Sequence, residues 1–251
     1  MRLTPEQVAT IRRVVRETAA NRHLAVVMPA RDEAAVIAGV IASVSRHLPG
    51  SPVIVVDDAS ADGTAAVAEQ AGAVVLRLPV PLGAWGAIQT GMRYALKQGF
   101  DAVVTMDADG QHLAEEIPKL LKIRDQDGAD VVIGAYPERG SRARRLAWSL
   151  FRRLSGFSLA DLTSGFRIYS RRALWLLASP RATLLEYQDL GVLILMRSSG
   201  LKIVETAVIM RPRLAGKSRV FSSWWRVALY MAQTVLLLLA CAHHRRRFKS
   251  G

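Results

Sequence analysis

The sequence of 251 residues contains a single cysteine, Cys241. One thiol excludes an intrachain disulfide and a zinc site built from several cysteines, and it suits a reducing compartment. The first 21 residues are charged and have no apolar core, so no secretory signal is expected there. The glycine-rich patterns that cradle phosphates, Gly-Xaa-Gly-Xaa-Xaa-Gly and Gly-Lys-Ser/Thr, are absent after the first apolar run. These absences argue against a dehydrogenase and a P-loop kinase.

Apolar runs long enough to span a bilayer are also lacking. The longest, 227–242, is interrupted only by Gln233 and Thr234. At about 1.5 Å per residue it reaches roughly 24 Å, short of a hydrocarbon core of roughly 30 Å. Polar residues recur every three to four positions along its first half. We therefore expect 221–242 to form an amphipathic helix at a membrane interface, followed by a basic tail. A helix packed on the domain and a single short span remain alternatives.

The composition is that of a globular protein, with 51% hydrophobic and 22% charged residues and a mean hydropathy of +0.18. The net charge is +13 and the pI about 10.8, which suits either nucleic acid or an anionic membrane surface. Helix-turn-helix, zinc-finger and RNA-motif signatures are absent, so no nucleic-acid partner is expected. Aromatic residues alternate with arginines over 142–157, which predicts a helix at the membrane interface, with a solvated helix face as the alternative.

Short apolar runs alternate with helix-like stretches along the first half of the chain. Strands are expected at 24–28, 53–56, 74–76 and 103–106, and helices at 34–47, 65–70 and 84–98. Further strands are expected at 131–133 and 202–209. This alternation predicts an α/β fold, with a mostly parallel, Rossmann-like sheet covered by helices on both faces. The expected units are an N-terminal helical extension (1–22), the α/β domain (23–220) and the interface helix with its tail (221–251).

Acidic residues follow several of the expected strands. Residues i and i+2 of an extended chain point the same way, so Asp107 and Asp109 can face one cation together. Carboxylate oxygens suit Mg²⁺ or Mn²⁺, which is usually shared with substrate phosphates. Glu33, Asp58 and Asp109 all fall at carboxyl strand ends, where ligands bind in such sheets. This convergence favours a metal and nucleotide site over solvated loop acids.

Four motifs in order carry a family resemblance: PARDE (29–33), VDDASADGT (56–64), MDADGQH (106–112) and DLTSGFRIYSRRAL (161–174). From about Leu24 to about Val220 the chain resembles family 2 glycosyltransferases, and within them the dolichyl-phosphate mannose synthase and polyprenyl-phosphate group. The resemblance implies a GT-A-like fold and an inverting, metal-dependent enzyme. It also implies a UDP- or GDP-sugar donor and a polyprenyl-phosphate acceptor at the cytoplasmic membrane face.

The resemblance also implies roles for individual residues. The nucleotide pocket is expected from Pro29, Ala30, Arg31, Glu33 and Asp58, and the metal and diphosphate site from Asp107, Asp109 and Gln111. Further diphosphate contacts are expected from Arg139, Arg213 and Arg219, and contact with the acceptor phosphate from Arg145. Two departures from the family pattern are Tyr136, where arginine is common, and Arg31, where an aromatic residue is common.

Three interpretations stay open at this point. The basic loop 211–219 is either a mobile anion clamp or an exposed loop. Asp189 or Glu186 is either a catalytic base or sugar ligand, or an acid interacting with a helix dipole. A soluble family 2 enzyme acting on a hydroxyl, and a nucleotidyltransferase, are the alternative functions. Asp58→Ala is expected to weaken nucleotide binding without loss of stability, because a strand-end acid is expected outside the core.

Overall fold

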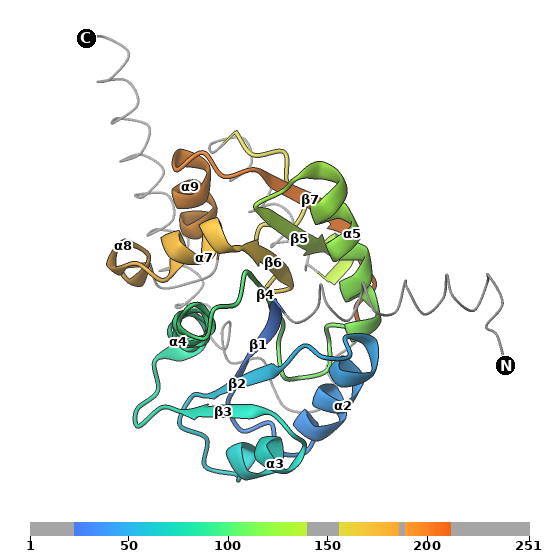
Figure 1. The fold of residues 1–251 in the computed structure, drawn as a ribbon, viewed down its shortest axis with the longest axis vertical. Coiled ribbons are helices and arrows are strands. Elements are labelled where there is room, and N and C mark those ends of the chain that lie inside the picture. The colour runs from blue at the N-terminus through green and yellow to red at the C-terminus, as the bar shows by residue number, and fades with distance from the viewer. Residues whose placement is uncertain (1–22, 140–155, 186–188, 212–251) are drawn as a thin grey trace, which may run out of the picture.

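The computed structural model describes residues 23–139, 156–185 and 189–211. They form a seven-stranded sheet in the order β3-β2-β1-β4-β6-β5-β7 (Figure 1). The strands are β1 (Leu24–Ala30), β2 (Val53–Asp57), β3 (Val74–Arg77), β4 (Ala102–Thr105), β5 (Val131–Ala135), β6 (Arg167–Ser170) and β7 (Ile203–Ala207). The predicted α/β class, with a mostly parallel sheet, is confirmed.

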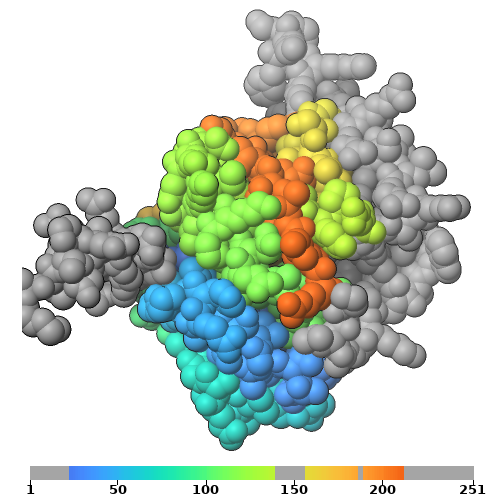
Figure 2. All heavy atoms as spheres, turned by 90° about the vertical axis from the view of Figure 1, so that its right-hand side faces the viewer, coloured from blue at the N-terminus to red at the C-terminus, as the bar shows by residue number. Residues whose placement is uncertain are grey.

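Helices cover both faces of the sheet. They are α2 (Ile37–His47), α3 (Thr64–Gln70), α4 (Gly83–Lys97), α5 (Ile117–Asp127), α7 (Arg171–Leu177), α8 (Pro180–Thr183) and α9 (Leu190–Ser198), with 3-10 turns η1 (Ala114–Glu116) and η2 (Pro137–Arg139). Buried side chains of α4, α7 and α9 form one core on one face. Those of α2, α3 and α5 form a second core on the other face. Figure 2 shows α2 (blue) and α5 (green) on the second face, with the orange-red chain of β7 beside α5.

The central strand β1 shows why the sheet is buried on both sides. Its residues alternate between the two cores, with Ala25 and Val27 in one and Val26 and Met28 in the other. A strand covered on both faces needs apolar residues at consecutive positions, which is the uninterrupted run seen in the sequence. Parallel pairing with β2 and β4 then brings the carboxyl ends of β1, β2 and β4 to one edge.

Strand β6 was not predicted, and it runs against its neighbours. It pairs antiparallel with β4 and with β5. Arg167, its first residue, lies opposite Thr105 of β4 and Ile133 of β5. The start of β6 therefore lies at the edge where the parallel strands end. The DLTSGFRIYSRRAL motif consequently supplies a loop at this edge, a strand and then α7.

Three predicted boundaries are corrected. Helix α2 begins at Ile37 instead of Ala34, because residues 31–36 form a turn in which Asp32 has a φ of 53°. Strand β7 covers 203–207, which is shorter than the predicted 202–209. The helix predicted over 142–157 does not include Phe157, which is non-helical. Its ring instead packs under the guanidinium of Arg197, with 3.8 Å from Cζ to the ring centroid.

The remaining predictions on segments concern parts of the chain outside the described residues. These are the N-terminal extension (1–22), the helix and tail (221–251) and most of 142–157. Within the described ranges, no helix is both long enough and apolar enough to cross a bilayer.

Candidate active site

The loops that follow β1 and β2 are tied together at the carboxyl edge of the sheet. Oδ1 of Asp32 accepts the N–H of Ala61 at 2.7 Å, and the N–H of Asp32 donates to Oγ of Ser60 at 2.9 Å. The N–H of Glu33 donates to Oγ1 of Thr64 at 2.8 Å. These bonds join residues about 30 positions apart and fix the backbone beside Pro29 and Ala30.

Asp62 strengthens the same junction. Its carboxylate accepts the hydroxyl of Thr64 at 2.5 Å and the N–H of Ala34 at 3.1 Å. Burial acts to raise the pKa of Asp62, but the hydrogen bonds from Thr64 and Ala34 outweigh it and lower the pKa below its ordinary value. The ionised form therefore holds the two loops together.

Asp58 directly follows β2 and holds the start of α4. Its side chain is buried, with 4% of the residue exposed. Oδ1 accepts the N–H of Leu82 at 2.6 Å, and Oδ2 accepts the N–H of Gly83 at 3.1 Å. Both N–H groups lie at a helix start, where no intrahelical acceptor exists. The expectation that Asp58 lies outside the core is thus wrong, and this acid supports α4.

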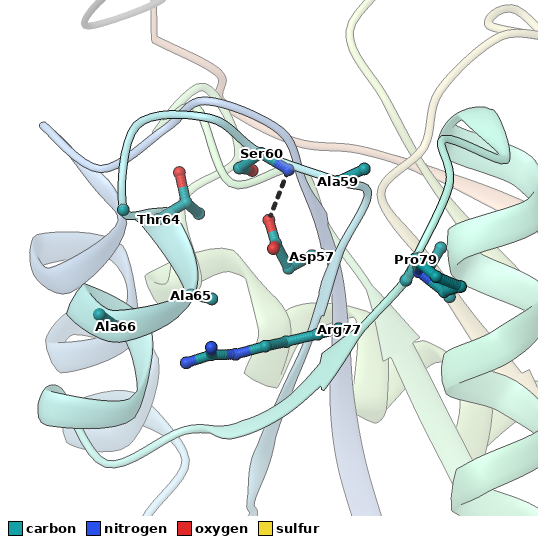
Figure 3. Close-up of a pocket in the computed structure, with 10 residues that line it drawn as sticks. Asp57, Ala59, Ser60, Thr64, Ala65, Ala66, Arg77 and Pro79 are labelled. Atoms are coloured by element: carbon teal, nitrogen blue, oxygen red, sulfur yellow. Dashed lines mark hydrogen bonds between the residues drawn. The ribbon is translucent and has the colours of Figure 1, made fainter.

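The preceding acid, Asp57, faces a separate hollow on the α3 side of the sheet (Figure 3). The hollow has a volume of about 430 Å³ and is lined by the end of β2, the start of α3 and the end of β3. Oδ1 of Asp57 accepts the N–H of Ser60 at 3.3 Å. Arg77, the register partner of Asp57 on β3, pairs with Glu69 at 2.9 Å. Asp57 therefore faces the hollow beside α3, whereas Asp58 bonds the start of α4.

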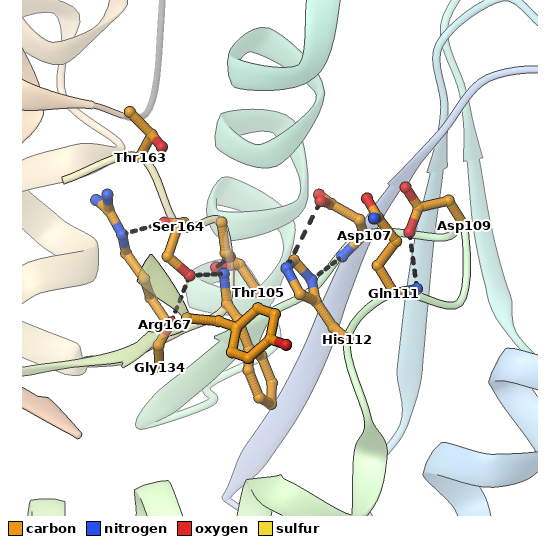
Figure 4. A network of polar contacts seen from close by, with 12 residues as sticks. Thr105, Asp107, Asp109, Gln111, His112, Gly134, Thr163, Ser164 and Arg167 are labelled. Atoms are coloured by element: carbon orange, nitrogen blue, oxygen red, sulfur yellow. Dashed lines mark hydrogen bonds and ion pairs between the residues drawn. The ribbon is translucent and has the colours of Figure 1, made fainter. Parts of the chain in front are cut away.

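The loop after β4 carries the two acids predicted to bind a metal (Figure 4). Asp107 is partly open, with a side chain 42% exposed. Asp109 is 2% exposed, and its Oδ1 accepts the N–H of Gln111 at 3.0 Å. This is an Asx turn, and Gly110 between the two residues adopts the φ of +77° that the turn requires. The sequence Asp-Gly-Gln therefore turns the chain directly after the second acid.

A second polar network lies beside this loop. Its members are not among the site residues predicted from the sequence. The guanidinium of Arg167 is fully buried and donates to the carbonyl oxygens of Ser164 at 2.7 Å and Leu162 at 3.1 Å. Oγ of Ser164 donates to the carbonyl of Gly134 at 2.6 Å. The hydroxyl of Thr105 donates to the carbonyl of Gly165 at 2.7 Å. These bonds fix the loop before β6 to β4 and β5.

Asp161 anchors the same loop on its other side. The carboxylate of Asp161 accepts the N–H of Thr163 at 3.1 Å and the N–H of Tyr136 at 3.4 Å. Glu205 of β7 accepts the N–H groups of Ala160 and Asp161. The signal in the sequence was the polar start of the fourth motif, where Asp161, Ser164 and Arg167 precede or begin a strand.

The other predicted site residues are distributed as follows. Pro29 and Ala30 end β1, Arg31 is exposed and Glu33 is partly buried. Arg139 ends η2. Asp189 is the N-cap of α9, and its side chain accepts the N–H of Gly191 at 3.2 Å. This contact agrees with the alternative interpretation of Asp189, in which the acid interacts with the start of a helix. Arg145, Glu186, Arg213 and Arg219 lie outside the described residues.

The donor set at the end of β4 fits a divalent cation that is shared with a ligand. Two carboxylates and an amide follow one another in a single loop, at Asp107, Asp109 and Gln111. Among the described residues no group of three or more acidic, histidine or cysteine side chains is arranged to enclose a metal. Mg²⁺ is commonly bound by one or two carboxylates, with substrate phosphates completing its shell. The loop suits that mode of binding.

The fold and this edge together define an α/β domain of the GT-A-like type, with acids at the ends of its parallel strands. The chain belongs to glycosyl transferase family 2, whose family model matches residues 25–177. A solved structure of glucosyl-3-phosphoglycerate synthase from Mycobacterium tuberculosis, with Mn²⁺, UDP and phosphoglyceric acid, is 26% identical. It superposes with a TM-score of 0.68 over 90% of this chain and 81% of the other.

Two curated relatives carry lipid-phosphate names. Undecaprenyl-phosphate mannosyltransferase of Micrococcus luteus is 38% identical over 138 residues, which is 49% of this chain and 56% of that protein. Polyprenol monophosphomannose synthase of Mycolicibacterium smegmatis is 31% identical over 165 residues, which is 59% of this chain and 62% of that protein. The matched part of this chain therefore spans less than two thirds of either relative.

Proposed function

We propose that this protein transfers a sugar from a UDP- or GDP-sugar to a polyprenyl-phosphate lipid at the cytoplasmic face of the membrane. The observation that carries the proposal is the loop after β4, where Asp107 and Asp109 follow a central strand inside a family 2 domain. The names of the two curated relatives, both lipid-phosphate mannosyltransferases, support this acceptor class.

The proposed donor site lies along the edge formed by β1, β2 and β4. Pro29, Ala30, Arg31, Glu33 and Asp58 are proposed to line the nucleoside end, and Asp58 also holds the start of α4. Asp107, Asp109 and Gln111 are the proposed ligands of Mg²⁺ or Mn²⁺, which would neutralise the diphosphate as it becomes the leaving group. The Mn²⁺ and UDP bound in the solved neighbour support a divalent ion in this role. Arg139, Arg213 and Arg219 are proposed to add positive charge at the diphosphate.

The proposed chemistry is a single inverting displacement. The acceptor phosphate attacks the anomeric carbon from the face opposite the diphosphate, so the configuration inverts. A lipid phosphate is already anionic near neutral pH, and the step therefore needs neutralised charge more than a general base. The engagement of Asp189 in capping α9 supports a route without a carboxylate base. Arg145 is proposed to meet the acceptor phosphate.

A second candidate is transfer to a water-soluble acceptor, and the solved neighbour favours it because that structure holds phosphoglyceric acid. A hydroxyl acceptor requires a base to take its proton. Asp189 is the candidate for that role, after release from its helix cap. The two candidates therefore differ in how strongly the rate depends on this acid.

The test is a matrix of donors and acceptors. UDP-glucose, UDP-N-acetylglucosamine, UDP-galactose and GDP-mannose are each incubated with a polyprenyl phosphate or with 3-phosphoglycerate, and release of nucleoside diphosphate is measured. We expect release with one donor only when the polyprenyl phosphate is present, and loss of release in excess EDTA. Transfer to 3-phosphoglycerate alone would favour the second candidate, and activity in excess EDTA would refute the metal.

Membrane association is a separate part of the proposal. It rests on the basic and aromatic composition of 142–157 and 221–251. Each basic residue near an anionic surface contributes about 1 kcal/mol, and salt weakens that contribution. We expect the protein to sediment with liposomes that contain acidic lipid and to be released by high salt. Equal sedimentation with neutral liposomes at both salt concentrations would contradict an electrostatic contact.

A further inference from the structure

His112 faces Asp107 with both of its ring nitrogens (Figure 4). The backbone N–H of Asp107 donates to Nδ1 of His112 at 2.9 Å. Because Nδ1 accepts this hydrogen, a neutral ring carries its own hydrogen on Nε2. Nε2 lies 3.7 Å from Oδ2 of Asp107, so the hydrogen-bearing nitrogen attracts the carboxylate across a gap longer than a hydrogen bond.

The imidazole ring is itself fixed in place. His112 is 3% exposed, and its ring stacks on Phe166 of the loop before β6, with centroids 5.1 Å apart and planes 14° apart. Its backbone forms an isolated bridge with Met210, beyond β7. The neighbouring carbonyl of Gln111 accepts the N–H of Arg211 at 3.0 Å. A buried ring that stacks on Phe166 and is carried by a paired backbone gives the nearby carboxylate a stationary partner.

The two acids of the loop are supported differently. Asp109 is buried and bonded within its own turn. Asp107 has a side chain 42% exposed, and an exposed aspartate samples several rotamers unless a neighbour restricts it. The contact with His112 supplies such a restriction at the acid that is open to solvent. Groups that orient metal-binding side chains in this way tune affinity for the metal.

We infer that His112 is a positioning residue, which holds the carboxylate of Asp107 in the orientation that meets a divalent cation. The inference rests on the proposed metal-dependent function. His112 acts here through Asp107 and makes no contact with the ion. A purely structural role, filling space against Phe166, is the alternative to be separated by experiment.

Two variants separate the roles because they preserve different features of the side chain. His112→Gln keeps an amide near the position of Nε2, the nitrogen that faces the carboxylate, but removes the ring. His112→Phe keeps a flat ring for the stack on Phe166 but removes both nitrogens. Positioning predicts weaker Mn²⁺ binding in His112→Phe, by about tenfold, which is the lower end for outer-shell partners of metal ligands. His112→Gln should lie closer to the wild type.

Binding of Mn²⁺ is measured by electron paramagnetic resonance on the full-length protein with UDP, and then with GDP. The Mn²⁺ concentration for half-maximal activity should rise in parallel in His112→Phe, while the rate at saturating Mn²⁺ recovers. Unfolding temperatures identify variants that fail to fold. If His112→Gln is one of them, His112→Asn replaces it and tests the contact of Nδ1 with the backbone N–H of Asp107 alone.

The reverse order, with Mn²⁺ affinity kept by His112→Phe and lost by His112→Gln, would show that only packing matters and would overturn the inference. Equal affinity in wild type and both variants would overturn it too, while leaving the proposed function intact. A wild-type protein that binds no Mn²⁺ with either nucleotide would remove the proposed metal site itself and the inference with it.

Discussion

The ends of β2 and β4 carry acids that look alike in sequence and differ in use. Asp58, directly after β2, is buried, and both of its carboxylate oxygens accept backbone N–H groups at the start of α4. Asp107, after β4, is partly exposed and faces His112 across 3.7 Å. One acid therefore organises the fold beside the site, and the other remains accessible to a ligand. Position at a strand end marks the edge, while the hydrogen-bond partners decide the role.

The largest effect should come from replacing Asp107, the partly exposed acid. Asp107→Asn keeps the shape of the side chain and removes the charge proposed to meet the metal. We expect a loss of about 10³-fold or more in turnover, equivalent to about 4 kcal/mol in the activation barrier. The unfolding temperature should change little, because the side chain is 42% exposed. Steady-state rates and thermal melts measure the two quantities. Full activity in this variant would remove Asp107 from the catalytic site.

Replacement of Asp58, the buried acid, should lower stability, in contrast to Asp107→Asn. Asp58→Ala leaves two N–H groups at the start of α4 without their acceptor. Loss of a helix cap costs about 0.5–2 kcal/mol, and hydrogen bonds to charged groups contribute about 1.5–3 kcal/mol each. We expect the free energy of unfolding to fall by about 2–3 kcal/mol in urea titrations. Asp58→Asn, which keeps one acceptor, is the matched control and should lose less. Unchanged stability in Asp58→Ala would show that the acid does not support α4.

An effect of intermediate size is expected from Gly134, which lies beside Phe166. A Cβ on Gly134 would lie 2.9 Å from Cδ1 of Phe166 and 3.1 Å from Cγ1 of Val208. Overpacking of this kind costs about 1–3 kcal/mol. Gly134→Ala should therefore lower the free energy of unfolding by about that amount, as measured by urea titration. It should also weaken Mn²⁺ binding, because Phe166 carries the ring of His112. Destabilisation with unchanged Mn²⁺ binding would indicate that the stack of His112 on Phe166 does not affect the position of the Asp107 carboxylate.

The smallest effect concerns the junction of the β1 and β2 loops. Asp62→Asn keeps one oxygen acceptor and removes the charge, so we expect a loss of about 1 kcal/mol or less at neutral pH. Because the folded pKa of Asp62 is lowered, its stabilisation is present above the ordinary pKa and disappears as the pH falls through the folded value. Thermal melts of wild type and variant should therefore converge in acid. A constant difference across pH would exclude ionisation as the cause.

The sequence was sufficient for the parallel half of the fold. Consecutive apolar residues such as those of β1 identify a strand buried on both faces, and helix-like stretches between such strands fix their parallel direction. Strand β6 was missed because its four residues, Arg167–Ser170, mix charged, aromatic and polar side chains. An arginine that is fully buried among carbonyl oxygens gives no apolar signal, and only its tertiary partners explain it.

The site was predictable as a set of strand-end acids but not as a set of roles. Spacing alone predicted a shared direction for Asp107 and Asp109, and the turn after Asp109 follows from its Asp-Gly-Gln sequence. The cap made by Asp58 depends on Leu82 and Gly83, more than 20 residues away. The part played by His112 depends on Phe166 and Met210, which are farther still. Contacts across such distances have no local pattern in the sequence.

The reversed direction of β6 has a consequence for how this protein family can diversify. Strand β5 ends at the ligand edge and β6 starts there, as their antiparallel pairing requires. The connection from 136 to 166 therefore begins and ends at one edge of the sheet. Within its described part, Leu159 and Leu162 belong to one core and Phe166 to the other. A change in the length of this connection therefore leaves strand order and both cores intact only if these three residues keep their places.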